Sequence, residues 1–215
     1  IRHLPKDLVW ECVQGLLQER SPELATFRDW ISYVFGPGIA RLFMLPYNFK
    51  VWATPAELMQ YSWIGERVSV VDLEGVLKNL ILGLDDSGWG PNNTFRFPLH
   101  GGTGDIFNRL AAKAHGHLRL NASVVRVDVE RKCVELADGQ RVEWECLLNT
   151  GPLDRLVRDW IRPASDVLHH AAEGLEHNSV FVSGVGVEGV RPDPTCWMYF
   201  PESNCPFYRV TNFHN

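Results

Sequence analysis

Hydrophobic residues in the first 83 positions recur at intervals of three and four, which is the spacing of amphipathic helices. A first helix is predicted to open after Pro5, because proline suits the first turn of a helix. The residues that this helix would turn inward are Leu8, Val13, Leu16 and Leu17. The amino-terminal part of the chain is therefore expected to be helical.

Three further helices are predicted from the same periodicity. Thr26 suits the N-cap of the first, and Thr54 fits a capping box with a proline at the first helical position of the second. Because glycine and proline interrupt helices, residues 36–38 should end the first one. The predicted helices cover residues 27–35, 56–64 and 72–82.

Beyond the loop at residues 85–93 the hydrophobic period shortens to two, which favours strands. A helix is predicted over residues 105–114, and the Asp-Gly pair at 138–139 predicts a hairpin turn. The short apolar run at 146–150 is typical of a buried parallel strand. Other strands are predicted over residues 94–97, 118–120, 125–129, 133–136, 141–144, 179–187 and 198–200. The pattern thus predicts a helical part followed by a mixed sheet.

Composition and charge exclude several classes of protein and ligand. The 215 residues are 45% hydrophobic and 22% charged, as in ordinary globular proteins. The net charge of −5, without a run of Lys or Arg, argues against nucleic-acid binding, so an anionic ligand would need a few well-placed arginines. Five cysteines without a CxxC pair predict free thiols in a reducing compartment, and the scattered histidines predict no metal site. No stretch approaches the length of a membrane span.

Three segments carry candidate chemistry, each with an ordinary structural explanation beside it. The aromatic run at 43–52 favours a helix junction filled by large side chains, with a stacking wall for a planar base as the alternative. The glycine-rich run at 101–104 could place N–H groups against a phosphate or a flavin ring. A plain tight turn explains it as well, because the G-x-G-x-x-G spacing is absent. In the third segment, at residues 196–215, Arg209 has the planar fork that suits phosphate, and Tyr199 and Tyr208 offer flat rings with a hydroxyl at the tip.

Together these runs resemble UDP-galactopyranose mutases, most closely the eukaryotic-type branch of that family. The most specific runs are Pro-Tyr-Asn-Phe-Lys-Val-Trp at 46–52 and Cys-Pro-Phe-Tyr-Arg at 205–209. Residues 65–68 and 89–104 match in the same order, so the resemblance extends through nearly the whole chain. The glycine turn and the hairpin are shared more widely, with FAD-dependent amine-oxidase-like proteins.

The resemblance implies an enzyme, an isomerase that interconverts UDP-galactopyranose and UDP-galactofuranose through attack of the N5 atom of reduced FAD on the anomeric carbon. UDP-galactose would be the small-molecule substrate, with NAD(P)H as a candidate reductant. No nucleic acid or membrane is expected as a partner, a homo-oligomer is a candidate assembly, and the implied location is cytoplasmic. The alternatives are an FAD-dependent amine-oxidase-like oxidoreductase and a non-catalytic nucleotide-sugar-binding fragment.

Residue roles follow from the same resemblance. Arg67 and Arg209 would be the catalytic pair that holds the diphosphate, with Tyr199 donating to it. The residues expected around the uridine, the sugar or the rest of the ligand are Phe43, Met44, Asn48, Trp52 and Asn92. On the flavin side, Gly101 and Gly102 would lie near the isoalloxazine, and Val124 would meet the adenine end.

The expected fold class is mixed α/β (α+β), a partial FAD/NAD(P)-binding Rossmann-like fold with a helical substrate domain and an antiparallel sheet. Residues 1–90 would form the helical substrate-binding domain, 91–155 part of the FAD-binding domain, and 156–215 part of a substrate-side β-sheet domain. The strand, glycine loop and helix that bind the FAD pyrophosphate in this family are absent from the 215 residues, as is its carboxy-terminal third. The chain is therefore expected to be an internal fragment that is inactive by itself.

Overall fold

The computed structural model describes residues 1–20, 23–65, 68–85, 96, 98–189 and 195–213. Its contacts divide the chain into two compact units. The first unit combines Ile1–Phe95 with Val180–Asn215, and the second is Arg96–Ser179. The division into three domains with boundaries at 90 and 155 stays a prediction.

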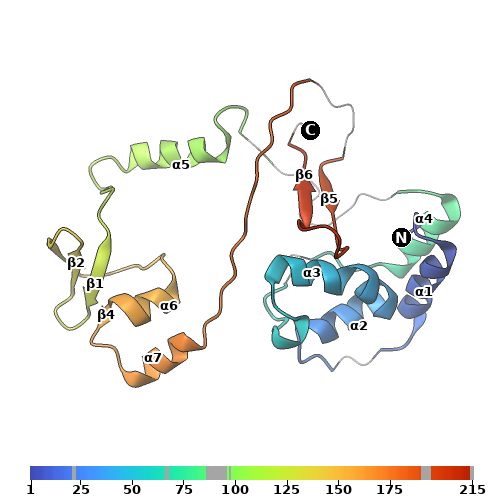
Figure 1. Ribbon diagram of the computed structural model, residues 1–215, viewed down its shortest axis with the longest axis horizontal. Coiled ribbons are helices and arrows are strands. Elements are labelled where there is room, and N and C mark those ends of the chain that lie inside the picture. The colour runs from blue at the N-terminus through green and yellow to red at the C-terminus, as the bar shows by residue number, and fades with distance from the viewer. Residues whose placement is uncertain (21–22, 66–67, 86–95, 97, 190–194, 214–215) are drawn as a thin grey trace. The chain divides into compact units, whose positions relative to one another are not determined.

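Helices are the main regular elements of the first unit (Figure 1). The α-helices are α1 (Lys6–Leu17), α2 (Phe27–Ile39), α3 (Leu45–Trp52) and α4 (Leu73–Leu82). A π-helical turn, η1 (Ala40–Met44), joins α2 to α3, and a short 3₁₀ turn, η2 (Ala56–Leu58), follows α3. Because these segments follow one another with little intervening loop, residues 27–52 form one nearly continuous helical stretch.

Local signals fix both ends of the regular part of α2. The Thr26 side chain accepts a hydrogen bond from the Asp29 N–H, and the Asp29 carboxylate accepts one from the Thr26 N–H at 2.9 Å, which completes a capping box. At the other end Gly36 has φ 71°, a left-handed value that favours glycine, and it interrupts the helical backbone. The predicted cap and the predicted break are both confirmed.

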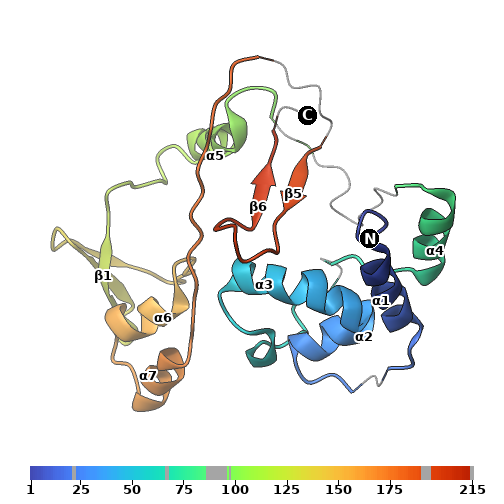
Figure 2. The ribbon, with the colours of Figure 1, turned by 45° about the vertical axis from the view of Figure 1, so that its right-hand side comes forward.

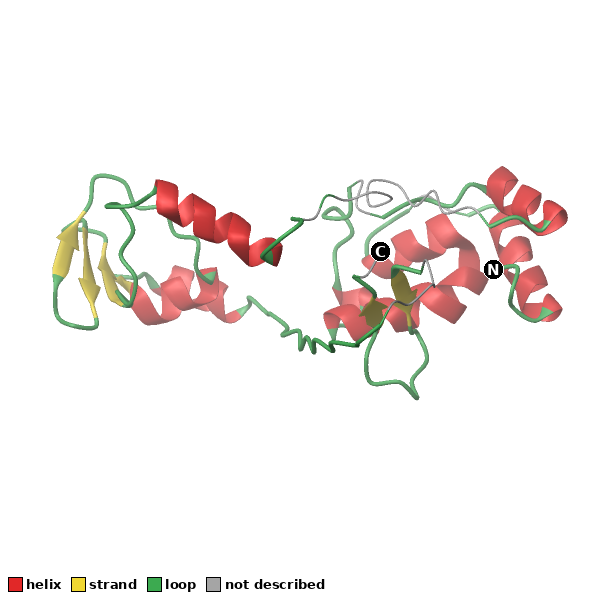
Figure 3. Ribbon diagram, turned by 90° about the horizontal axis from the view of Figure 1, so that it is seen from above, coloured by secondary structure: helices red, strands yellow, loops and turns green. Residues whose placement is uncertain are grey.

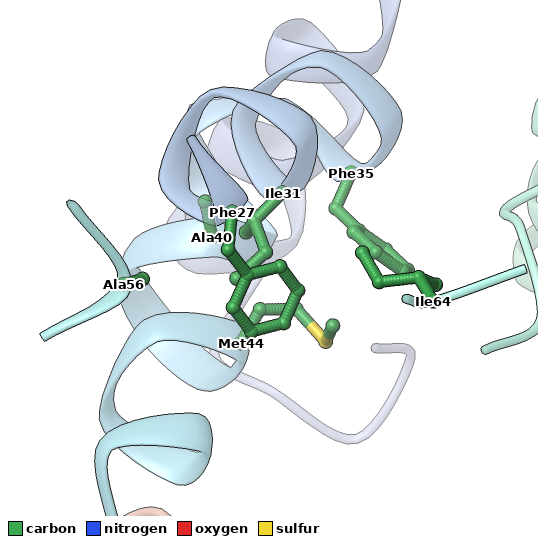
Figure 4. Packing of buried hydrophobic residues seen from close by; sticks show 7 residues of the cluster. All are labelled: Phe27, Ile31, Phe35, Ala40, Met44, Ala56 and Ile64. Carbon is green, nitrogen blue, oxygen red and sulfur yellow. The ribbon is translucent and has the colours of Figure 1, made fainter. Parts of the chain in front are cut away.

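The hydrophobic core of the first unit lies between α2, η1 and the segment that follows α3. Phe27 and Ile31 are almost completely buried, and Figure 4 shows their side chains converging with that of Met44. The buried cluster consists of Phe27, Ile31, Phe35, Ala40, Met44, Ala56 and Ile64. The spacing of 27, 31 and 35 is the four-residue repeat of one helix face, so the sequence pattern and the packing agree.

Helix α1 packs closely against α2 at a site that only glycine fits. A Cβ atom added at Gly38 would lie 2.8 Å from the Cα atom of Cys12, in the backbone of α1. This close approach buries Cys12, Val13 and Leu16 of α1, whereas Leu17 is 58% exposed. The predicted inward positions of α1 are therefore confirmed for Val13 and Leu16 and wrong for Leu17.

A two-stranded hairpin near the carboxyl end also belongs to the first unit. Strands β5 (Trp197–Tyr199) and β6 (Arg209–Thr211) pair antiparallel, with Tyr199 directly opposite Arg209. The ladder continues past Tyr199, because the Phe200 N–H donates to the Tyr208 carbonyl over 2.9 Å. Figure 2 shows the loop end of this hairpin next to α3.

The second unit contains a four-stranded mixed sheet in the order β3-β2-β1-β4, which is visible with its helices in Figure 3. The strands are β1 (Val124–Asp128), β2 (Cys133–Leu136), β3 (Arg141–Glu143) and β4 (Ile161–Arg162). Only the β1–β4 pair is parallel. The helices are α5 (Gly102–Lys113), α6 (Leu153–Arg155), the π-helical turn η4 (Leu156–Trp160) and α7 (Asp166–Glu173). The predicted mixed class of helices and sheets is confirmed.

Four predicted elements differ from the structure. Residues 118–120 were predicted to form a strand, but no strand begins before Val124 in this part of the described chain. The predicted helix 56–64 is reduced to the turn η2, because the Thr54 hydroxyl donates to the Trp52 carbonyl instead of capping the residues after it. Residues 146–150 and 179–187 form no strand, because neither has a pairing partner among the described residues. Phe181 is accordingly 97% exposed. Most of the predicted strand 94–97 lies outside the described residues.

Candidate functional site

An aromatic cluster in the first unit centres on Tyr47. Phe43 and Tyr47 are four residues apart on one helical face, and their rings stack with centroids 5.2 Å apart and planes 7° apart. The Tyr199 ring meets both edge-on, with centroids 5.3 Å from Tyr47 and 6.2 Å from Phe43. Tyr208 adds a further edge contact to Tyr47 at 6.1 Å. Residues from η1, α3 and the hairpin thus share one wall of rings.

The pairing of β5 with β6 places Arg209 at the edge of this cluster. Directly opposed residues project from the same face of a sheet, so Arg209 and Tyr199 are side-by-side neighbours. The Arg209 guanidinium carbon lies 5.8 Å from the centre of the Trp197 ring, a cation–π contact. In the part of the chain that the structure describes, no carboxylate pairs with Arg209. The arrangement offers an exposed guanidinium fork beside a tyrosine hydroxyl.

Burial raises the pKa of two tyrosines at this site. It raises the pKa of Tyr47 to about 12, although the nearby positive charge of Arg209 opposes the shift. Burial also raises the pKa of Tyr199, again against the effect of Arg209. A protonated phenol can donate a hydrogen bond to an anion, whereas a phenolate would repel it. The electrostatics therefore suit a negatively charged ligand.

A second face of the same helical segment carries three of the predicted ligand residues. Met44 is 7% exposed and belongs to the hydrophobic core. One turn later, the Asn48 side-chain nitrogen donates to the Met44 carbonyl over 2.7 Å, which leaves its side-chain oxygen as an acceptor. Trp52 is half-buried and meets the ring of Trp63 at 5.1 Å. Of these three, Asn48 offers an acceptor oxygen, Trp52 has its indole N–H as a polar group, and Met44 is apolar.

The flavin-side residues lie in the second unit. Gly101 and Gly102 begin α5 with φ values of 74° and 61°, both in the region that favours glycine. No side chain caps this helix, so the first-turn N–H groups of α5 have no local side-chain acceptor. Val124 is the first residue of β1 and pairs with Leu136.

Two predicted site residues, Arg67 and Asn92, lie outside the described residues. Among the others, the structure brings together Phe43, Tyr199 and Arg209. It also adds Tyr47 and Lys50, which the sequence analysis did not select. The four-residue spacing from Phe43 to Tyr47 was a usable signal for Tyr47, because residues so spaced share a helix face.

Three further observations concern the described residues alone. No three or more His, Cys, Asp or Glu side chains gather there in a way that could hold a metal ion. None of the helices found there has both the length and the apolar character needed to cross a membrane. All five cysteines are free thiols.

The pKa of Tyr47 gives a testable prediction. Its unfolded-state value is near 10, so the stability that this phenol contributes is fully present below pH 10 and is lost as pH rises toward about 12. Phenolate absorbance of the folded protein should therefore show a late rise near pH 12 that Tyr47→Phe removes. Tyr33→Phe, which removes an exposed phenol, should leave that late rise in place. A late rise that survives in Tyr47→Phe would contradict the assignment.

Comparison with known proteins places this geometry in context. No family model matches the chain. A crystal structure of reduced UDP-galactopyranose mutase superimposes with a TM-score of 0.81 at 34% sequence identity. The match covers 99% of this chain and 48% of that chain, so the 215 residues span about half the length of the solved mutase. The resemblance predicted from the sequence is confirmed: this chain has the fold of the corresponding part of a UDP-galactopyranose mutase.

Proposed function

We propose that the protein containing this chain is a UDP-galactopyranose mutase that isomerises UDP-galactopyranose and UDP-galactofuranose with reduced FAD. The observation that carries the proposal is the pairing of Tyr199 with Arg209 beside the Phe43–Tyr47 wall. A site for a nucleotide sugar needs flat surfaces for the base or sugar and strong donors for the diphosphate. The fold match to a mutase supports the same conclusion.

Arg209 and Tyr199 would bind the diphosphate. The guanidinium can donate two parallel hydrogen bonds to phosphate oxygens, and the Tyr199 hydroxyl, whose pKa burial raises further, can donate a third. When the bond between the sugar and the diphosphate breaks, negative charge grows on the leaving phosphate oxygen. Arg209, together with Arg67, would stabilise that charge, which makes both arginines catalytic residues in this proposal.

The remaining ligand residues would shape the nucleotide and sugar pocket. Phe43 presents a ring face in the aromatic cluster, and Asn48 presents its side-chain oxygen. Met44 and Trp52 pack in or against the core in this structure, so they would hold the pocket walls rather than donate hydrogen bonds. Asn92 stays a predicted ligand contact.

The residues assigned to FAD are compatible with that cofactor. A Cβ atom added at Gly102 would meet no atom within 4 Å, whereas one at Gly101 would lie 2.7 Å from the Cβ atom of Asp105, so the open space at the start of α5 lies over Gly102. A planar ring with carbonyl oxygens could approach such a surface and accept hydrogen bonds from the uncapped first-turn N–H groups of α5. Gly101 and Gly102 would hold the ring, and the Val124 backbone would meet the adenine end. Reduced FAD, when bound, supplies the nitrogen nucleophile for the anomeric carbon.

The experiment is a conversion assay on the full-length protein. It would be reduced with dithionite, given UDP-galactofuranose and analysed by chromatography for UDP-galactopyranose. Conversion that disappears with oxidised flavin is the expected result. A protein that holds FAD but converts nothing would instead favour the amine-oxidase-like oxidoreductase, because that class shares the fold. NAD(P)H as reductant and a homo-oligomeric state stay predictions.

A further inference from the structure

Lys50 of α3 connects the aromatic wall to the hairpin that carries Tyr199 and Arg209. Its ammonium nitrogen donates to the Phe200 carbonyl over 2.7 Å and to the Glu202 carbonyl over 3.0 Å. These acceptors are 150 and 152 residues away in the sequence. The Lys50 side chain is therefore a direct tie between two distant segments of the first unit.

This contact differs from the usual state of a lysine on a helix. Most such ammonium groups remain hydrated, because their flexible stems and high charge favour water. Lys50 is half-buried, and no carboxylate within the described ranges pairs with it. Hydrogen bonds from a charged donor are shorter and stronger than neutral ones, so two of them on carbonyls two residues apart hold the loop firmly.

The loop that Lys50 contacts begins directly after β5, next to the proposed diphosphate site. Phe200 follows Tyr199 directly, and its N–H already donates to the carbonyl of Tyr208, the residue before Arg209. Lys50 occupies the carbonyl of the same Phe200. Both backbone groups of the residue next to the Tyr199–Arg209 pair are thus fixed, one by the ladder and one by α3.

We propose that Lys50 is a positioning residue that sets the Tyr199–Arg209 pair against the Phe43–Tyr47 wall. This inference rests on the proposed function, since it concerns the same diphosphate site. Lys50 contributes no atom to the reaction. It acts by holding the strand that carries the diphosphate donors, and a small displacement of such groups can weaken binding strongly.

The test measures UDP binding by calorimetry and steady-state kinetics in the full-length protein. Lys50→Met removes both hydrogen bonds and should weaken UDP binding about tenfold, the equivalent of one charge-assisted hydrogen bond. The KM should rise by a similar factor and kcat should fall as well, because the displaced Arg209 would also stabilise the charge that grows as the sugar–diphosphate bond breaks. Lys50→Arg keeps the charge and the donors and should restore binding to within about threefold of wild type.

Two controls make the outcome decisive. Lys78→Met removes a positive charge from an exposed position on α4 and should leave UDP binding unchanged within about twofold. Lys50→Gln keeps a shorter neutral donor and gives an intermediate loss even if Lys50→Met fails to fold. Lys50 variants that bind UDP as tightly as wild type, whatever their melting temperature, would overturn the inference. Wild-type protein that binds no UDP would overturn the proposed function, and this inference with it.

Discussion

Replacing Phe27 by alanine is expected to lower the free energy of unfolding by about 3–5 kcal/mol, the usual loss when a buried aromatic ring is removed. Phe27 is 1% exposed, stacks on Trp30 at 6.0 Å and meets Trp63 edge-on at 5.3 Å. Its loss would leave a cavity next to Met44, which lies in the same cluster. The denaturant midpoint should fall while the dependence of unfolding on denaturant concentration stays the same.

Phe49 provides the matched control for this prediction. It is also a phenylalanine in a helix of the first unit, but 54% of its surface is exposed. Phe49→Ala should therefore change the free energy of unfolding by less than about 1 kcal/mol, as most exposed substitutions do. Equal effects of the two substitutions would show that the cluster around Phe27 does not dominate the stability of this unit.

The two capping signals show how far local sequence determines a helix in this chain. Thr26 and Thr54 begin similar motifs, yet only the helix after Thr26 forms at the predicted length. After Thr26, the buried residues follow the four-residue repeat that buries one helix face. After η2, burial alternates instead, with 59, 61 and 63 half-buried and 60 and 62 exposed. Residues 61–64 instead close a turn, in which the Ile64 N–H donates to the Tyr61 carbonyl over 3.0 Å, because no continuous face is buried there that could extend a helix.

Strand formation in this chain depends even more than helix formation on residues that are distant in the sequence. The hairpin joining β2 to β3 was predictable, because its partners are close in sequence and its turn has an Asp-Gly pair. The apolar run 146–150 has the composition of a buried strand, but Leu148 is 85% exposed. A strand requires a neighbouring backbone to accept and donate its hydrogen bonds, and composition carries no information about that neighbour.

The candidate site was only partly predictable, because some of its contacts also join residues that are far apart in the sequence. Arg209 and Tyr199 stood out through their chemistry and their resemblance to a family pattern. Tyr47 and Lys50 did not, because their roles arise from contacts with hairpin residues about 150 positions away. Pairing across such a distance is a property of the folded chain, and a single sequence does not reveal it.

Arg209→Ala in the full-length protein should weaken UDP binding about ten- to hundredfold. The guanidinium would supply the charge-assisted hydrogen bonds to the diphosphate, each worth about 1.5–3 kcal/mol, and each 1.4 kcal/mol corresponds to a factor of ten. Arg209→Lys keeps the charge and loses the planar fork, so its effect should lie between wild type and alanine. Calorimetric titration with UDP measures all three proteins on one scale.

Arg41→Ala is the control that separates the loss of the Arg209 contact from the loss of an arginine elsewhere in the same unit. It lies on η1 in the same unit, but its guanidinium already pairs with Glu11, with an N–O distance of 2.7 Å. Arg41→Ala removes the same charge from an exposed ion pair and should leave UDP binding unchanged within about twofold. If Arg41→Ala and Arg209→Ala weakened binding equally, the cause would be the net charge of the unit, and the specific contact assigned to Arg209 would be wrong. A large loss confined to Arg209→Ala would place the diphosphate on the Tyr199–Arg209 pair.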